Sequence, residues 1–380
     1  MTLEAERIER VVVRGANWVG DALMTVPALR ELRRLLPRAH VTLATRAWAR
    51  DIFDGADFID DLLVIEEPAR GVRSFLRQVR QWRARRFDLA LLFPNSIESA
   101  LVAFAARVPA RVGYATESRG EFLTHALETP AWRSTRHEVF YYLNLVAELG
   151  RALGVSSPRR NAQASRLDEL APQYALEVSD ARRAGAAALL EARGVDLARP
   201  LVALCPGSTN SRAKRWQAES YAALADRLAG EAGATVLLIG AREELDVTKE
   251  VVSRMRREAV VLTGETSLAE TAAILSLVGL LVTNDTGPAH LASALGRPTL
   301  VIFGPTNPLT TRPFSPVAEI VRRPPDCAPC MLRDCPIDHR CMTAITADEV
   351  FARAVALLGQ DRARVAAEPF ELEARAEAAR

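Results

Sequence analysis

The stretch LLVTNDTGPAH, residues 280–290, places an apolar run, a polar loop and a helix start directly after one another. The apolar run predicts a buried strand, and Pro288 suits the first turn of a helix because its missing N–H is not needed there. A second apolar run, Thr299–Phe303, follows a few residues later. A strand, a helix and a further strand in this order are typical of a parallel sheet covered by helices.

The same alternation extends through most of the chain. Apolar runs predict further strands at Val11–Val13, Val41–Ala44, Leu62–Ile65, Leu89–Phe93, Leu201–Leu204 and Thr235–Ile239. Amphipathic spacing predicts helices at Asp21–Leu36, Val72–Arg86, Gln217–Ala229, Glu243–Arg256, Leu268–Ser276 and Pro288–Leu295. Two capping-box patterns, Ser267 with Glu270 and Thr346 with Glu349, mark helix starts.

The alternation stops between about Gly154 and Ser179 and then begins again. We therefore expect an α/β fold with two doubly wound, Rossmann-like domains facing across a cleft. The expected boundaries are an N-terminal domain at 1–160, a linker at 161–178, a C-terminal domain at 179–358 and a charged tail at 359–380. Ligands of such sheets bind beyond the carboxyl ends of the strands, so the loops after strands are the ones to examine.

The composition of the 380-residue chain excludes several classes of protein. With 49% hydrophobic and 25% charged residues it is not disordered, and its net charge of +2 argues against a bulk nucleic-acid binder. No apolar run reaches the roughly 18 residues of a transmembrane helix. Met1–Arg10 lacks the apolar core of a signal peptide, so we expect a cytoplasmic protein that does not bind nucleic acid.

The loop after the first strand, Arg14–Asp21, contains two glycines in a Gly-x4-Gly spacing. This spacing is neither the dinucleotide fingerprint nor a P-loop, because Asp21 stands where a P-loop has its lysine. A carboxylate at this position is suited to accept a proton from a sugar hydroxyl. The alternative is that Asp21 only caps the following helix. The two roles are compatible.

Three loops in the second half carry groups suited to a nucleotide diphosphate. Ser208 and Thr209 offer hydroxyls and N–H groups, and Lys214 offers a cation; the alternative is an ordinary solvated loop. Glu244 follows another strand, where an acidic residue accepts ribose hydroxyls or interacts with a helix dipole.

The loop within residues 283–290 is the most specific of the three. The N–H groups of Thr286 and Gly287 are suited to face a phosphate. Asp285, beside that anion, is expected to hold a sugar hydroxyl or a loop amide. His290 lies one turn into the helix, and its alternative is a purely structural role.

Together these motifs resemble glycosyltransferase family 9, the lipopolysaccharide heptosyltransferases. The similar segments are Trp18-Val-Gly-Asp21-x5-Pro27-Ala-Leu29, Pro206-Gly-Ser208-x5-Lys214-Arg-Trp216, Asn284-Asp-Thr-Gly287-x2-His290 and Phe303-Gly-Pro305-Thr306. They occur in the family's order from about residue 10 to residue 355, and they look more like the heptosyltransferase II branch than the first enzyme.

The resemblance implies a GT-B fold and a metal-independent, inverting transfer of L-glycero-D-manno-heptose from ADP-heptose to the inner core of lipopolysaccharide. It implies that Asp21 is the general base, that Lys214 binds diphosphate, and that Glu244 lies near ribose. The remaining expected donor-binding residues are Ser208, Thr209, Asp285, Thr286, Gly287 and His290, and the expected acceptor-side loop residues are Asn17, Trp18 and Gly20. The alternatives are a related transferase for another nucleotide sugar or acceptor, and a nucleotide-sugar-binding protein without activity.

Two further features stand outside this set. Arg70–Arg86 holds seven arginines and no acidic residue, with Val72, Phe75, Leu76, Val79 and Trp82 as the expected apolar face. It is either a solvated basic face or a surface for an anionic glycolipid acceptor, in peripheral contact with the inner membrane.

The second feature is a group of four cysteines, Cys327, Cys330, Cys335 and Cys341, in a proline-rich segment. Their spacing allows a structural zinc site, an iron–sulfur cluster, or free thiols that pair under oxidation. No cofactor is expected for catalysis itself.

Overall fold

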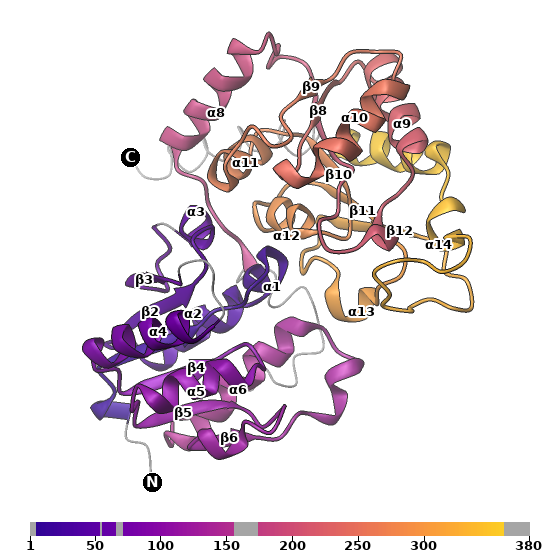
Figure 1. Cartoon of the computed structure of the whole chain (residues 1–380). Coiled ribbons are helices and arrows are strands. Elements are labelled where there is room, and N and C mark those ends of the chain that lie inside the picture. The colour runs from indigo at the N-terminus through magenta and orange to yellow at the C-terminus, as the bar shows by residue number, and fades with distance from the viewer. Residues whose placement is uncertain (1–4, 54, 66–70, 156–173, 361–380) are drawn as a thin grey trace, which may run out of the picture. The chain divides into compact units, whose positions relative to one another are not determined.

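The computed structural model describes residues 5–53, 55–65, 71–155 and 174–360. The chain divides into two compact units, Met1–Tyr174 with Leu309–Thr311, and Ala175–Pro308 with Arg312–Arg380 (Figure 1). This division falls inside the expected linker 161–178, of which residues 161–173 lie outside the described part. Of the expected charged tail, only Gly359 and Gln360 are described.

The first unit contains a parallel sheet of six described strands in the order β3-β2-β1-β4-β5-β6. The strands are β1 (Arg10–Arg14), β2 (His40–Thr45), β3 (Asp61–Val64), β4 (Leu89–Leu92), β5 (Ala110–Tyr114) and β6 (His125–Leu127). The chain builds outward from β1 to one edge and then returns to add β4 on its other side. The strand order therefore reverses between β1 and β4, which is where doubly wound sheets hold ligands.

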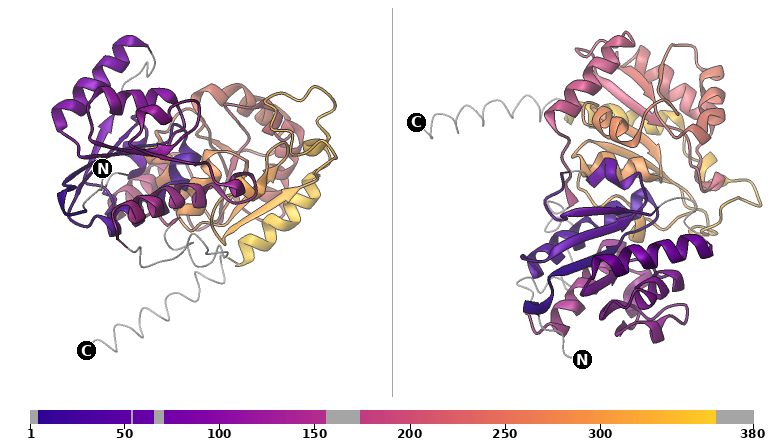
Figure 2. Two further views of the ribbon diagram at one scale, coloured as in Figure 1. Left: turned by 90° about the horizontal axis from the view of Figure 1, so that it is seen from below. Right: turned by 60° about the vertical axis from the view of Figure 1, so that its left-hand side comes forward.

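Helices cover both faces of this sheet (Figures 1 and 2). They are α1 (Val19–Met24), α2 (Val26–Leu35), α3 (Ala49–Phe53), α4 (Val72–Arg85), α5 (Ile97–Ala105) and α6 (Glu138–Ala152). Helices α2 and α6 pack against each other, and so do α4 and α5. Val12 of β1 and Leu92 of β4 share a hydrophobic cluster with Trp82 of α4 and therefore face that helix. Because side chains alternate along a strand, the neighbours of these residues face the opposite side of the sheet.

The expected single helix Asp21–Leu36 was wrong in two respects. The structure begins α1 at Val19 and separates it from α2 at Thr25. Pro27 explains the break, because it has no N–H to donate to the carbonyl of Leu23. The Thr25 hydroxyl instead donates to the carbonyl of Ala22 at 2.6 Å.

The second unit repeats the arrangement with six described parallel strands in the order β12-β11-β10-β7-β8-β9. The strands are β7 (Leu201–Cys205), β8 (Thr235–Leu238), β9 (Val260–Val261), β10 (Leu280–Asn284), β11 (Thr299–Phe303) and β12 (Ala318–Arg322). The order reverses between β7 and β10. The loops after these two strands are the ones that carry the Lys214 and Asp285 motifs.

The helices described in this half of the chain are α8 (Asp180–Ala192), α9 (Ala218–Gly230), α10 (Leu245–Arg254), α11 (Leu268–Leu275), α12 (Gly287–Ala294), α13 (Pro308–Thr311) and α14 (Arg340–Thr343), followed by a helix at 347–360. Short 3₁₀ turns lie at Ala5–Arg7, Gly120–Phe122, Ala131–Ser134, Arg212–Lys214 and Arg242–Glu244. The capping box at Ser267 is confirmed, since its hydroxyl accepts from the N–H of Glu270 while the Glu270 carboxylate accepts from the N–H of Ser267.

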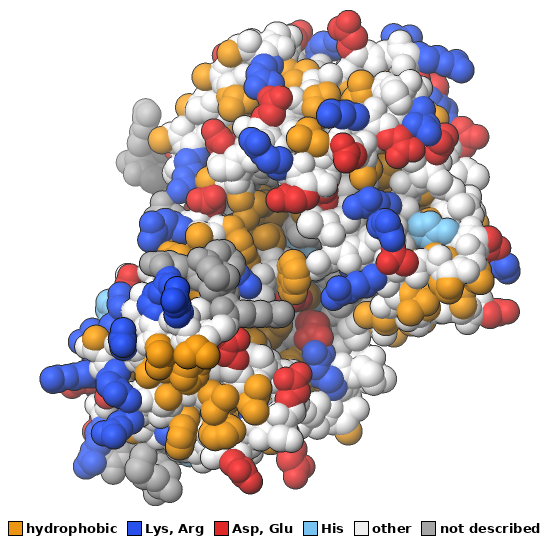
Figure 3. Space-filling view, viewed as in Figure 1, with side chains coloured by type: hydrophobic (Ala, Val, Ile, Leu, Met, Phe, Trp, Pro, Cys, Tyr) orange, Lys and Arg blue, Asp and Glu red, His pale blue; other side chains and the backbone are white. Residues whose placement is uncertain are grey.

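The expected apolar face of α4 was only partly right. Val79 and Trp82 are buried and Phe75 is half-buried, but Leu76 is 44% exposed and Val72 is 74% exposed. Two polar residues of the same helix, Ser74 and Gln78, are buried instead. In the part of the first unit where Figure 1 draws α4 and α5, hydrophobic and basic side chains are both at the surface (Figure 3).

Arg70 lies outside the described residues. Among the helices that are described, none is long and apolar enough to cross a membrane.

Candidate functional site

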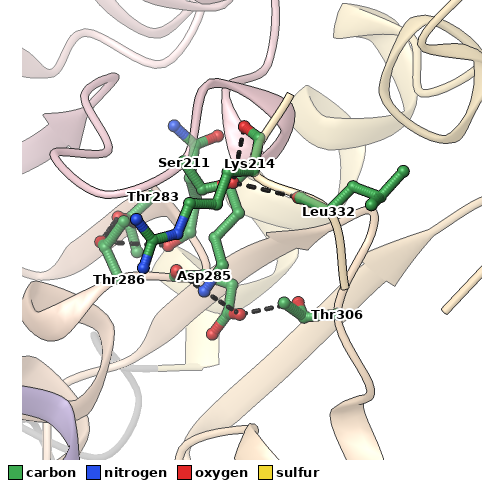
Figure 4. Close-up of polar contacts among 9 residues, drawn as sticks. Ser211, Lys214, Thr283, Asp285, Thr286, Thr306 and Leu332 are labelled. Carbon is green, nitrogen blue, oxygen red and sulfur yellow. Dashed lines mark hydrogen bonds and ion pairs between the residues drawn. The ribbon is translucent and has the colours of Figure 1, made fainter. Parts of the chain in front are cut away.

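Asp285 is the centre of a polar cluster at the carboxyl edge of the second sheet (Figure 4). Its Oδ2 accepts from the Lys214 ammonium at 2.9 Å and from the Thr306 hydroxyl at 2.7 Å. The ammonium also donates to the Asp285 carbonyl at 3.2 Å. The three residues follow β10, β7 and β11, which are neighbours in the sheet, and the Asp285 carboxylate is buried. The sequence anticipated a sugar hydroxyl or a loop amide for Asp285, whereas the structure gives it the lysine.

Lys214 keeps partial access to solvent in this arrangement. Its side chain is 27% exposed, against 5% for Asp285. An ammonium has three N–H donors, and two of them are directed at Asp285. The ion pair thus fixes the lysine, and among the described residues it leaves the third N–H donor of the ammonium for a ligand.

Asn284, at the end of β10, joins three segments of the second unit. Its fully buried amide donates to the carbonyls of Pro206 at 2.8 Å and Gly207 at 3.1 Å. Its Oδ1 accepts from the N–H of Trp216 at 3.0 Å and from the hydroxyl of Tyr221 at 3.2 Å. It therefore holds the Pro-Gly loop and the segment after Lys214 in register with Asp285. The sequence motif contained Asn284, but nothing in the sequence distinguished this scaffolding role.

Glu244 is buried between two loops. Its Oε2 accepts from the N–H of Ala241 at 2.8 Å, and its Oε1 accepts from the hydroxyl of Thr209 at 3.2 Å. Its carboxylate lies against Gly207 so closely that a Cβ added there would be 2.3 Å from Cδ. The structure thus brings Thr209 and Glu244 together. Ser208 is buried beside them, and its carbonyl accepts from the Arg215 guanidinium at 3.0 and 3.2 Å.

Helix α12 begins at Gly287, one residue earlier than expected, and Pro288 occupies its first turn. The N-cap residue, Thr286, forms no side-chain capping bond to the helix. Its hydroxyl bonds instead to the hydroxyl of Thr283 at 3.1 Å and donates to the carbonyl of Asn284 at 3.2 Å (Figure 4). His290 is buried one turn into the helix. The positive end of the α12 dipole thus follows Asp285 directly in the chain.

The loop that carries Lys214 is braced by the cysteine-bearing segment. The N–H of Ala213 donates to the carbonyl of Arg333 at 2.9 Å, and the carbonyl of Ala213 lies 2.6 Å from His339 Nε2. The Ser211 hydroxyl reaches the carbonyls of Leu332 and Arg333 at 3.4 and 3.2 Å. Sequence reasoning missed this brace because its contacts are mostly to backbone atoms, which no side-chain motif encodes.

The structure does not support a zinc site at the four cysteines. All of them are free thiols, and among the described residues no three His, Cys, Asp or Glu side chains are grouped closely enough to hold a metal ion. Cys327 is exposed, whereas Cys341 is buried and packs next to Gly304. Burial, with the other three cysteines nearby, raises the pKa of Cys341 to about 11.

The expected acceptor-side residues all lie in the first unit, at the start of α1. Trp18 is the N-cap and Asp21 is in the first turn, so the N-cap role considered for Asp21 falls to Trp18. Asn17 and Trp18 are exposed, the latter by 55%, and Gly20 and Asp21 are half-buried. An exposed indole three residues before a carboxylate puts a flat apolar surface and a proton acceptor in one short segment.

Asp21 has an aromatic neighbourhood on α6. Burial is the main cause that raises the pKa of Tyr142, and the negative charge of Asp21 is the second. The Tyr142 ring also packs edge-on against Phe93, 5.2 Å between ring centroids. Tyr142 thus connects the charge of Asp21 with Phe93, the residue that directly follows β4.

Comparison with known proteins identifies related sequences. The family model of glycosyltransferase family 9 (heptosyltransferase) matches residues 75–340. Lipopolysaccharide heptosyltransferase 2 of Salmonella typhimurium is 30% identical over 321 residues, which are 82% of this chain and 88% of that protein. The protein of the same name from Escherichia coli K12 has the same identity and coverage.

One solved structure extends the comparison to the fold. The structure of E. coli ADP-heptose LPS heptosyltransferase II matches with a TM-score of 0.76 at 26% identity, covering 93% of this chain and 100% of that one. The expected fold class, a GT-B fold with two Rossmann-like domains, is confirmed by this match and by the two observed sheets.

Proposed function

Because the chain belongs to glycosyltransferase family 9, the heptosyltransferase family, we propose that it transfers L-glycero-D-manno-heptose from ADP-heptose to the inner core of lipopolysaccharide. The proposed acceptor is heptosyl-Kdo-lipid A, which already carries one heptose. The names of the relatives support this choice, since both are second heptosyltransferases of lipopolysaccharide. The observation that carries the proposal is the Lys214–Asp285 pair, a fixed cation at the carboxyl edge of the second sheet.

In this proposal the second unit binds the donor. Lys214 and the N–H groups of Thr286 and Gly287 receive the diphosphate, and the α12 dipole favours the same charge. Glu244 and Thr209 face the ribose, while Ser208 and His290 complete the pocket. Because Asp285 is bonded to Lys214 and Thr306, its charge is largely offset before the diphosphate arrives.

The first unit supplies the base. Asp21 takes the proton of the acceptor hydroxyl while that oxygen forms its bond to the anomeric carbon of the heptose. The bond from this carbon to the diphosphate breaks, and its electron pair leaves with ADP. One displacement of this kind inverts the anomeric centre, and a positioned base contributes roughly 10²–10⁴-fold to the rate. Lys214 and the loop amides stabilise the leaving diphosphate, so the step needs no cofactor.

The acceptor is an anionic glycolipid, so we place the enzyme in the cytoplasm with peripheral contact to the inner membrane. Helix α4 supports this part of the proposal. Arg73, Arg80 and Arg83 are exposed on it, together with Leu76 and Val72. Basic side chains beside exposed apolar ones favour the surface of an anionic bilayer.

The test measures release of ADP from ADP-heptose by the full-length protein. It is run without acceptor, with Kdo-lipid A, and with heptosyl-Kdo-lipid A. We expect release only with the heptosylated acceptor; release with the bare acceptor would indicate the first transferase, and no release with either would refute the proposal.

Two variants separate the roles of the units. Asp21→Asn should bind ADP as the unchanged protein does but lose at least 10²-fold in transfer rate. Lys214→Ala should bind ADP at least tenfold more weakly, because it loses a charge-assisted contact to the diphosphate. Near-normal turnover by Asp21→Asn would exclude Asp21 as the base.

A further inference from the structure

Helices α4 and α5 expose large apolar side chains at the surface of the first unit. The two helices pack against each other and share one hydrophobic cluster with the sheet. On α4, Val72 is 74% and Leu76 is 44% exposed; on α5, Ile97 is 40% and Phe104 is 49% exposed. Hydrophobic side chains gather at the surface where Figure 1 draws these helices, with basic side chains beside them (Figure 3). An exposed group of this kind, unlike a scattered single residue, marks a contact surface.

The outward face of α5 is apolar along its whole length. Ile97, Leu101 and Phe104 recur at spacings of four and three residues, so they lie on one face of the helix. Ile97 and Phe104 are exposed and Leu101 is half-buried. The inward face is occupied by other residues, among them Ala100 and Ala103, which are fully buried in the cluster with the sheet. Folding of the unit therefore does not explain the outer stripe, because a helix on a soluble surface normally has a polar outer face.

Helix α4 has the reverse of the usual pattern as well. Its buried positions include the polar Ser74 and Gln78, whose side chains bond to each other at 3.3 Å. Gln78 and Trp82 line a cavity of about 90 Å³ that residues of α5 also line. Val72 and Leu76, one turn apart, are left outside. Both helices thus expose apolar side chains that contribute little to the core.

Positive charge accompanies these apolar side chains. Helix α4, Val72–Arg85, contains no acidic residue, and Arg73, Arg80 and Arg83 are exposed on it. Arg83 extends toward α5, where its guanidinium donates to the carbonyl of Ala105 at 2.5 Å. Exposed Arg107 follows the end of α5. On α5 itself Glu98 is the one charged residue, and it is half-buried.

Phe104 is held in place although half of its surface is exposed. The Arg111 guanidinium lies 5.4 Å from the centre of the Phe104 ring, and it is fixed by bonds of 2.6 Å to the carbonyls of Phe122 and Val108. The Phe122 ring packs edge-on against Phe104, with 5.5 Å between centroids. An aromatic ring oriented in this way, with arginines around it, suits the boundary between lipid headgroups and acyl chains.

We propose that the outer face of α4 and α5 binds the anionic phospholipids of a bilayer directly, with Phe104 and its apolar neighbours entering the acyl boundary. The residues that define this lipid-binding face are Val72, Leu76, Ile97, Phe104, Arg73 and Arg80. The inference rests on the proposed function and deepens its membrane contact, because it names the lipid class and adds the stripe on α5. A bilayer suits this face because lipid binding needs diffuse positive charge and an apolar row, without fixed polar pairings.

The first arm of the test measures binding of the full-length protein to vesicles that contain no glycolipid. Vesicles of phosphatidylcholine alone and of equimolar phosphatidylcholine and phosphatidylglycerol are compared by co-sedimentation. We expect at least tenfold tighter binding to the anionic vesicles, weakened by added salt, because attraction of exposed charges to a surface is screened. Equal binding to both compositions would refute the role of the arginines. Binding to neither would overturn the proposal in favour of a protein partner.

Paired substitutions then locate the face. Arg73→Gln with Arg80→Gln should weaken binding to anionic vesicles at least tenfold, since each arginine near such a surface contributes about fivefold. Arg256→Gln with Arg257→Gln, which changes two exposed arginines of the second unit, is the matched control and should leave binding unchanged. An equal loss of binding in the two double variants would refute the assignment.

Single substitutions separate insertion from charge. Phe104→Gln should weaken binding about tenfold without altering its salt dependence, because it removes an apolar contact. Val252→Gln, on α10 and 42% exposed, is the matched control. Glu121→Gln removes an exposed negative charge next to Phe122 and should strengthen binding several-fold, which a misfolded variant cannot do. Unchanged binding by Phe104→Gln would refute insertion of the α5 stripe.

The second arm measures transfer to heptosyl-Kdo-lipid A, presented in anionic vesicles or in neutral detergent micelles. The Arg73 and Arg80 double variant should raise the KM for the acceptor at least tenfold in vesicles and leave it unchanged in detergent. An equal rise in both would assign these arginines to the acceptor itself and contradict the proposal. If the unchanged protein transfers no heptose, the proposed function has failed, and the vesicle arm still decides whether this face binds lipid.

Discussion

Replacing Gly207 by alanine tests how tightly Glu244 joins the two loops of the second unit. A Cβ at position 207 would be 2.3 Å from Glu244 Cδ and 2.5 and 2.7 Å from its two carboxylate oxygens. Glu244 is buried and bonded to Ala241 and Thr209, so it cannot move aside without losing those bonds. The clash is a matter of space alone, since the backbone at Gly207 does not have a positive φ.

The expected cost follows from this geometry. Overpacking of a buried site costs about 1–3 kcal/mol. Glu244→Ala removes two hydrogen bonds to a charged group, from the N–H of Ala241 and the hydroxyl of Thr209, and this loss should cost a similar amount, about 1–3 kcal/mol. In the double variant the added methyl group occupies space that the carboxylate has left. Its free energy of unfolding should therefore match that of Glu244→Ala, a coupling of about 2 kcal/mol between the two changes.

The assay is thermal unfolding of the two single variants and the double variant. A loss of about 2 kcal/mol in a unit of this size lowers the midpoint by roughly 4–8 °C. The matched control is Gly185→Ala, in the exposed middle of α8 with no atom within 4 Å of the added Cβ. It should raise stability by about 0.5–1 kcal/mol through helix propensity. Additive losses in the double variant would refute the reasoning.

Two further predictions concern buried groups of the second unit. Asn284→Ala removes the partner of four buried groups and should lower the free energy of unfolding by at least about 3 kcal/mol, measured as a lower urea midpoint. A loss of stability below about 0.5 kcal/mol would mean that water replaces the amide. Burial raises the pKa of Cys205 to about 12 and, with the nearby cysteines, that of Cys341 to about 11, so at pH 7 only about one Cys341 in ten thousand is a thiolate. Iodoacetamide should therefore label exposed Cys327 first and these two last in a peptide map, and prompt labelling of Cys341 would contradict this order.

The elements that define the fold could be predicted because their signals are local. A run such as Leu280–Val282 is apolar on every residue, which is typical of a strand buried on both faces. The capping box at Ser267 encodes its own helix start for the same reason. The division at Thr25 could also have been found, since Pro27 was visible inside the expected helix and its missing N–H is a fixed property of the residue.

The interior of the site could not be predicted in the same way. That Lys214 bonds to Asp285 depends on the order of strands in the sheet, because 71 residues separate them. Gln78 illustrates a second limit. On a helix rich in arginine it is expected to face solvent, yet its place opposite the end of β1 makes it part of a cavity wall. A polar side chain that is buried in a cavity wall contradicts the pattern from which burial is inferred.

In the proposed donor site, the Lys214–Asp285 pair keeps a cation in place without binding anions indiscriminately. A lone buried ammonium would be costly to desolvate, and a solvated one would have to be ordered by each arriving ligand. Bonding to Asp285 avoids both costs, and the Thr306 hydroxyl shares the carboxylate's charge. The remaining attraction then comes from one ammonium N–H, the loop amides and the α12 dipole, and these act together only on a diphosphate that spans them. A single phosphate reaches fewer of these donors, so the same arrangement that keeps Lys214 in place favours the larger ligand.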